Sequence, residues 1–166
     1  MDMGTERESI LTIGRNTIAT EARALSTIEK RLDDSFANAV ECIHNCRGRL
    51  IITGLGKSGH VARKIAATLT STGTRASFLH ATEALHGDLG IIAPDDVVMA
   101  LSYSGETEEV VRVAEFVATN KNTLIAMTGN NDSSLAKYSD ITDETDVAMI
   151  RTFYDMFLEK APFEKF

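Results

Sequence analysis

The clearest fold signal in the chain is RLIITGLGKSGH, residues 49–60. It begins as a short aliphatic, β-branched run and closes on a glycine-rich turn at 54–59. It then enters an apolar helical pattern that stops at Ser71–Gly73. A continuous apolar strand that feeds a helix through a glycine turn is typical of a parallel sheet buried on both faces. The stretch therefore predicts a β-α unit.

The same strand and helix alternation recurs along the chain. Strands are predicted at 76–80, 96–102 and 122–129, and helices over 110–117 and 133–138. This alternation predicts a doubly wound, flavodoxin-like α/β domain of about five parallel strands, with helices on both faces and right-handed crossovers. Ligands of such folds bind outside the carboxyl ends of the strands, where the strand order reverses.

The first 47 residues read as helix, with a break at Asp33–Ser35. We expect residues 1–47 to form a helical arm and residues 48–166 to form one α/β domain. The arm carries more apolar residues than a solvated extension should, including Ile10, Leu11, Ile13 and Ile18. These apolar residues of the arm predict that the chain forms a homo-oligomer.

Composition excludes several classes of protein. The chain has 166 residues, of which 43% are apolar and 25% are charged, as in a globular domain. A net charge of −7 argues against nucleic acid or an anionic membrane as partner. No apolar run is long enough to span a membrane, and the charged N-terminus is not a signal peptide. Cys42 and Cys46 do not have zinc-site spacing, so we expect their side chains to pack in the protein as free thiols. Free thiols are typical of a reducing cytoplasm, which is the expected location. We expect neither a metal nor a cofactor.

The glycine turn could bind an anion. Gly54, Gly56 and Gly59 form a GxGxxG pattern, but the acidic residue expected about 20 positions later in a dinucleotide site is missing. A P-loop fails as well, because its first glycine would fall on Ile51. What remains is a helix N-terminus with Lys57 and Ser58 beside it, or a tight turn whose polar residues only cap the helix.

The segment SYSGET, residues 102–107, ends the third predicted strand. The hydroxyls of Ser102, Ser104 and Thr107 and the backbone amides there could cradle one phosphate without an arginine. The alternative is an ordinary N-cap with a capping box. Glu83, His86 and Asp88 follow the second strand, where His86 is either a proton shuttle, a metal ligand or a structural histidine.

These motifs together resemble the SIS (sugar isomerase) domain family, and within it the D-arabinose 5-phosphate isomerases. GLGKSGHVARKIAATLTSTGT, EALHGDLGII and SYSGETEEV carry the resemblance from Ile51 to about Val110. It implies that Lys57 and Glu109 are catalytic and that His86 lies in the active site near a subunit boundary. The phosphate would be held by Gly56, Ser58, Ser102, Tyr103, Ser104 and Thr107.

The resemblance also implies a tetramer that converts D-ribulose 5-phosphate to D-arabinose 5-phosphate for Kdo in lipopolysaccharide or capsule. It is weaker after about Val110, continues through LIAMTGNNDSSLAKYSD, and ends after Asp140, where the family's glutamate and histidine segments have no counterpart and no CBS domains follow. Glu144 is the candidate replacement for the glutamate, and residues 147–157 read as an amphipathic terminal helix.

An isomerase of this kind moves a proton between C1 and C2 through an enediol(ate), which requires a base and a donor to the developing oxyanion. Glu109 is the candidate base and His86 the second candidate. Lys57 could polarise the carbonyl or pair with the phosphate. A non-catalytic sugar-phosphate sensor and a nucleotide-binding Rossmann domain are the alternatives.

Overall fold

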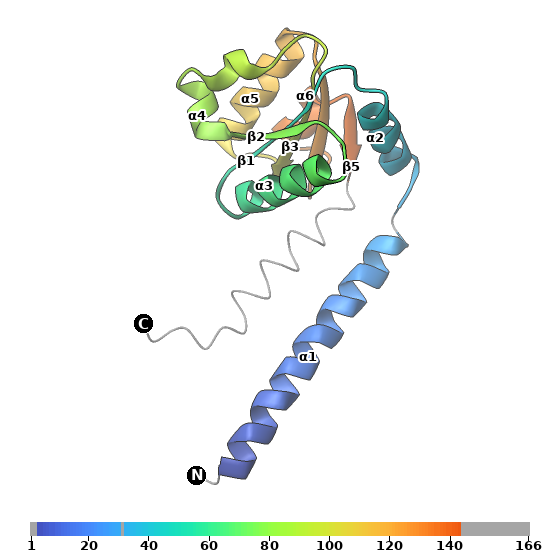
Figure 1. Ribbon diagram of the computed structural model, residues 1–166, viewed down its shortest axis with the longest axis vertical. Coiled ribbons are helices and arrows are strands. Elements are labelled where there is room, and N and C mark those ends of the chain that lie inside the picture. Colours follow the sequence, from blue (N-terminus) through green and yellow to red (C-terminus); the bar gives the residue numbers. More distant parts are fainter. Residues whose placement is uncertain (1–2, 31, 144–166) are drawn as a thin grey trace.

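The computed structural model describes residues 3–30 and 32–143 (Figure 1). Glu144 and the terminal helix predicted at 147–157 therefore lie outside the described residues. In chain order the elements are α1 (Met3–Glu29), α2 (Asp34–His44), β1 (Leu50–Gly54), α3 (Gly56–Ser71), β2 (Ala76–His80), α4 (Ala81–Leu85), the 3₁₀ helix η1 (Asp88–Ile91), β3 (Val97–Ser102), α5 (Glu108–Thr119), β4 (Thr123–Thr128), α6 (Ser134–Tyr138) and β5 (Ile141–Asp143).

The strands form one parallel sheet in the order β2-β1-β3-β4-β5. The predicted α/β fold is confirmed, and the four strands foreseen from the sequence lie within two residues of their predicted bounds. The fifth strand, Ile141–Asp143, was not located by the sequence pattern. It is only 3 residues long, too short to show periodicity.

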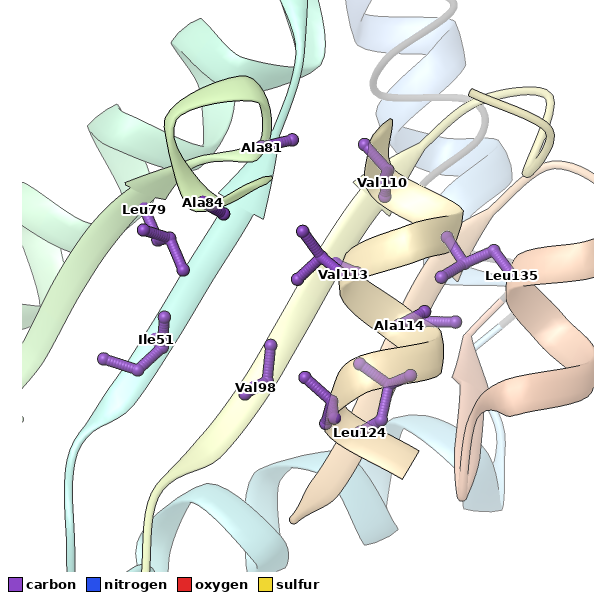
Figure 2. Packing of buried hydrophobic residues seen from close by; sticks show 13 residues of the cluster. Ile51, Leu79, Ala81, Ala84, Val98, Val110, Val113, Ala114, Leu124 and Leu135 are labelled. Carbon is purple, nitrogen blue, oxygen red and sulfur yellow. The ribbon is translucent and has the colours of Figure 1, made fainter. Parts of the chain in front are cut away.

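The sheet is buried on both faces, as its apolar strands predict. One face packs against α4, α5 and α6, and Figure 2 shows Ile51, Val98 and Leu124 of the sheet on this side. The other face packs against α2 and α3, through Ile52, Leu101 and Ala62 among others. Helices α3 and α5, which follow β1 and β3, thus cover opposite faces.

Asp96 fixes the amino end of the sheet, away from the ligand-binding end. Its buried carboxylate accepts hydrogen bonds from the backbone N–H groups of Arg49 (2.6 Å) and Ala93 (2.9 Å). The Asn122 side chain donates to the Asp96 carbonyl at 3.0 Å. These bonds tie the starts of β1, β3 and β4 together and so fix the relative heights of the strand ends where the site lies.

The two N-terminal helices differ in their packing. Asp33 caps α2 by accepting hydrogen bonds from the Ser35 hydroxyl and backbone N–H, and these bonds hold the pKa of Asp33 below its usual value. Ala39 of α2 is buried in the core. Helix α1 instead extends away from the sheet (Figure 1), and Ile10 and Ile18 are 63% and 69% exposed. The domain boundary at residues 47 and 48 stays a prediction.

Candidate functional site

The strand order reverses between β1 and β3. These strands are neighbours in register, with Gly54 opposite Leu101. Their helices leave toward opposite faces, and ligands of doubly wound sheets bind in the crevice outside two such strand ends. The first loop, Gly54–Gly59, and the second loop, Ser102–Thr107, therefore flank the same crevice, as the sequence predicts.

Glycine shapes the first loop. A Cβ at Gly59 would lie 2.9 Å from the Gly54 carbonyl oxygen, so only glycine lets α3 start this close to β1. Gly56 has φ +56°, in the left-handed region that favours glycine. Leu55 precedes α3 without a side-chain cap, which leaves first-turn N–H groups to an anion. Lys57 is exposed in that first turn.

Hydroxyl groups order the second loop. The Ser102 hydroxyl is buried and lies 3.0 Å from the Thr107 hydroxyl, with either group able to donate. Ser104 Oγ accepts from the Glu106 backbone N–H at 3.2 Å, so its own hydrogen is available to a further acceptor. Tyr103 is 42% exposed. The phosphate-binding candidates of this loop are thus brought together at one strand end.

The capping-box alternative does not describe this loop. Thr107, rather than Ser104, is the N-cap of α5, and its side chain makes no capping hydrogen bond. Glu106 accepts instead from the backbone N–H of Ser134 at 2.8 Å, and that hydrogen bond lowers the pKa of Glu106. Glu106 therefore pins the loop to α6 rather than capping its own helix.

A segment that the sequence analysis did not single out supports the second loop. The carbonyls of Tyr103 and Gly105 accept from the backbone N–H groups of Gly129 (2.9 Å) and Leu135 (3.0 Å). A Cβ at Gly105, where φ is +68°, would collide with the side chain of Ser133. The turn after β4 thus forms the floor of the second loop. Gly129 and Asn130 are turn-forming residues, but nothing in the sequence indicates that this turn contacts the second loop.

The candidate acid and base residues belong to α4 and α5, which pack on the same face of the sheet. Glu109 is half-buried in the first turn of α5, whereas Glu106 and Glu108 are exposed. His86 is exposed at the C-cap of α4, which follows β2, and its backbone N–H donates to the Glu83 carbonyl at 2.9 Å. These positions agree with roles in proton transfer, which remain predictions.

Two buried polar atoms were missed by sequence reasoning. Thr53 Oγ1 and His80 Nδ1 have no hydrogen-bond partner among the described residues. They lie near the carboxyl ends of the adjacent strands β1 and β2. A buried polar group without a hydrogen bond costs about 1–3 kcal/mol of folding stability. The sequence does not show which polar group will be left without a partner. A groove of about 480 Å³ lies beside His80, lined also by Arg63, Phe78 and Asp88.

Among residues 3–30 and 32–143, no cluster of three or more histidine, cysteine, aspartate or glutamate side chains could hold a metal ion. The described helices include none long and apolar enough to cross a membrane. Cys42 and Cys46 are free thiols, and burial is the main cause of the raised pKa of Cys42.

Comparison with known proteins places these features in a family. The family model of the SIS domain matches residues 43–158. Arabinose 5-phosphate isomerase KpsF of Escherichia coli O6:H1 is 44% identical over 140 residues, 84% of this chain and 43% of KpsF. Arabinose 5-phosphate isomerase KdsD of Pseudomonas aeruginosa is 46% identical over 133 residues, 80% of this chain and 41% of KdsD. The chain thus spans about two fifths of the length of these curated relatives.

A solved structure is similar over nearly its whole length. An E. coli CFT073 protein in complex with arabinose 5-phosphate superposes with a TM-score of 0.78 at 32% identity. The match covers 95% of this chain and 90% of that chain. The similarity therefore extends beyond the motifs of the two loops.

Proposed function

The chain belongs to the SIS-domain family, and we propose that it interconverts D-ribulose 5-phosphate and D-arabinose 5-phosphate. The observation that carries the proposal is the pair of loops at the β1 and β3 ends, which offer anion-binding groups on both sides of one crevice. The names of the curated relatives and the arabinose 5-phosphate bound to the similar E. coli protein support the choice of sugar.

The second loop and the start of α3 would hold the phosphate. Ser104 is exposed and has a hydrogen to donate, because its oxygen already accepts from Glu106. Buried Ser102 fixes the hydroxyl of Thr107 and so acts as a positioning residue. Backbone N–H groups at Gly56, Ser58 and Tyr103 complete the proposed cradle. Neutral donors of this kind suit a chain with a net charge of −7, which disfavours anions at long range.

The carbon chain of the sugar would cross the β1 end. Strands lie about 4.8 Å apart, so the ends of β3 and β2 are separated by roughly 9–10 Å. That span fits an open-chain pentose with its phosphate at the second loop and C1 and C2 directed toward α4. Lys57 lies between these ends, on the first loop. Because α4 packs against the start of α5, the reacting carbons would lie within reach of Glu109 and His86 as well as of Lys57.

The proposed reaction has two halves, and each pairs one proton transfer at carbon with one at oxygen. Glu109, or His86 as second candidate, removes a proton from C1 of the ketose. The electron pair of that C–H bond forms the C1–C2 double bond, and the C2 oxygen accepts a proton to give the enediol. Loss of the O1 proton and protonation of C2 then give the aldose. Lys57 would stabilise the negative charge that develops on the C2 oxygen.

The finer parts of the proposal concern the setting of the reaction. Arabinose 5-phosphate made here would supply Kdo synthesis for lipopolysaccharide or capsule, as the resemblance implies. Free Cys42 and Cys46 suit the reducing cytoplasm. We also propose a homo-oligomer, with a tetramer as the family's expected form, because apolar residues of α1 are exposed.

One experiment separates the proposal from its rivals. The full chain is incubated with D-ribulose 5-phosphate, aldose formation is measured, and thermal melts are recorded with pentose phosphates, hexose phosphates and NAD. Turnover that is lost in Glu109→Gln and kept in Glu108→Gln supports the isomerase. Stabilisation by a sugar phosphate without turnover would favour a sensor, and stabilisation by NAD alone would favour a dinucleotide site.

A further inference from the structure

Strand β2 is one edge of the sheet, and part of its backbone is open. The Leu50 N–H donates to the Arg75 carbonyl at 2.9 Å, and the register continues to Gly54 opposite His80. In a parallel ladder, every second residue turns its N–H and C=O toward the neighbouring strand. The N–H and C=O of Phe78 and the N–H of His80 therefore face away from β1. No other described residue forms a hydrogen bond with these groups, so the edge can still pair with a further strand.

The groove beside His80 lies along this open edge. Its floor is formed by Phe78, Leu79 and His80 of β2, and its volume is about 480 Å³. One wall belongs to α3, which covers the face of the sheet where Phe78 packs. The other wall belongs to α4 and η1, on the face where Leu79 lies with Ala84 (Figure 2). The groove is therefore a slot between the two helical layers, directly beside the last strand.

The two walls of this slot carry opposite charges. Arg63 of α3 holds its guanidinium carbon 4.3 Å from the centre of the Phe78 ring. Glu83 of α4 and Asp88 of η1 line the other wall, and all three charged side chains are exposed. Within the described part of the chain, none of the three forms an ion pair. The charges of both walls thus remain available to an occupant of the slot.

We propose that the β2 edge binds an extended, basic peptide segment of another protein as a further strand. An added strand pairs its main chain with an open edge, and its alternate side chains enter pockets on either side. Here one set would face Glu83 and Asp88, which select basic side chains, and the other set would face α3. A lone amino acid would meet the charges but not the spaced N–H and C=O groups of β2. The net charge of −7 also favours a basic segment.

Amide hydrogen exchange on the full chain tests the open edge and its occupant. Without peptide, the Phe78 amide should exchange faster than the Leu79 amide, which faces β1. The capped peptide acetyl-Val-Lys-Val-Lys-Val-amide, at millimolar concentration, should slow exchange at Phe78 roughly tenfold. The same peptide with N-methyl groups on its three central residues lacks their main-chain donors and should give much less protection. No protection of Phe78, or equal protection by both peptides, would overturn the proposal.

Charge reversal tests the acidic wall. Glu83→Lys combined with Asp88→Lys should raise the dissociation constant of a fluorescent form of the peptide roughly tenfold, as measured by anisotropy. Glu108→Lys combined with Glu115→Lys makes the same change of net charge on α5, outside the groove, and should keep the affinity. Equal losses in both variants would indicate unspecific attraction to an acidic protein and would reject the site.

Light scattering separates the peptide from a second copy of this chain as the occupant. The mass of the protein, apart from bound peptide, should not change when the peptide is added. A fall in mass would assign the β2 edge to a contact between copies and would overturn the proposal. Melting curves verify that each variant stays folded, and none of these measurements depends on isomerase activity.

Discussion

The two loops of the candidate site are held in place by different means. The first loop is shaped by its glycines. Because Gly54 and Gly59 have no side chain, the backbones of β1 and α3 come into direct contact. The second loop is instead pinned from outside, by hydrogen bonds to the turn after β4 and to α6. The difference shows that the first loop is fixed by its backbone, with Lys57 exposed upon it, whereas the hydroxyls of Ser102 and Thr107 in the second loop also support each other.

The largest effect should come from the residue that the first loop presents. Lys57→Ala should lower kcat roughly 10²–10³-fold if the ammonium group stabilises the developing oxyanion, because that contact strengthens in the transition state. Lys64→Ala, an exposed lysine further along α3, is the matched control. Steady-state kinetics with D-ribulose 5-phosphate measure both variants. A higher KM with unchanged kcat would make Lys57 a phosphate clamp and move the catalytic assignment to His86 and Glu109.

The glycines of the two loops should differ in what a methyl group does. Gly105→Ala adds an unfavourable positive φ and a collision with Ser133, and should cost about 3 kcal/mol of folding stability. Gly56→Ala meets no atom within 4 Å and should cost only about 1–2 kcal/mol, from its positive φ. Urea unfolding of both variants gives the two values. Equal losses would mean that the second loop yields more readily than its contacts indicate.

Ser104 should contribute to binding rather than to turnover. Ser104→Ala removes a hydroxyl donor to a charged oxygen, worth roughly 1.5–3 kcal/mol. The loss should raise KM and leave kcat nearly unchanged, because the phosphate is bound in both the ground and the transition state. Ser71→Ala, at the far end of α3, provides the control. An effect confined to kcat would contradict the phosphate cradle.

The smallest effect concerns the pin between Glu106 and Ser134. The hydrogen bond from the Ser134 backbone N–H holds the pKa of Glu106 below its ordinary value in the folded state. A depressed carboxyl pKa stabilises the fold above the unfolded-state value, and that contribution is lost as the pH falls through the folded-state value. Melting temperatures between about pH 6 and pH 3 should therefore fall slightly more steeply for the wild type than for Glu106→Gln. Parallel curves would show that the hydrogen bond between the Glu106 carboxylate and the Ser134 backbone adds no measurable folding stability.

Sequence patterns located the elements whose signals are local. Strand β1 is marked by Leu50–Thr53 and the glycine after it, and the loop after β3 by its hydroxyls. The short strand β5 and the support of Gly105 by Ser133 were not foreseen, because one lacks periodicity and the other joins residues far apart in the chain. The unpaired Thr53 Oγ1 shows the same limit, since burial is set by packing from several elements.

The position of β1 between β2 and β3 has a consequence for the order of folding. Strand β3 must pass β2 and align on the far side of β1, so that Leu50 meets Val97. Such distant pairings form late, because chain entropy is lost before the contacts return any stability. The first loop is synthesised before the second loop because it comes earlier in the chain. The crevice between the two loops forms only after β3 has paired with β1. A sugar phosphate that contacts both loops would therefore stabilise the pairing of β3 with β1 once that pairing has formed.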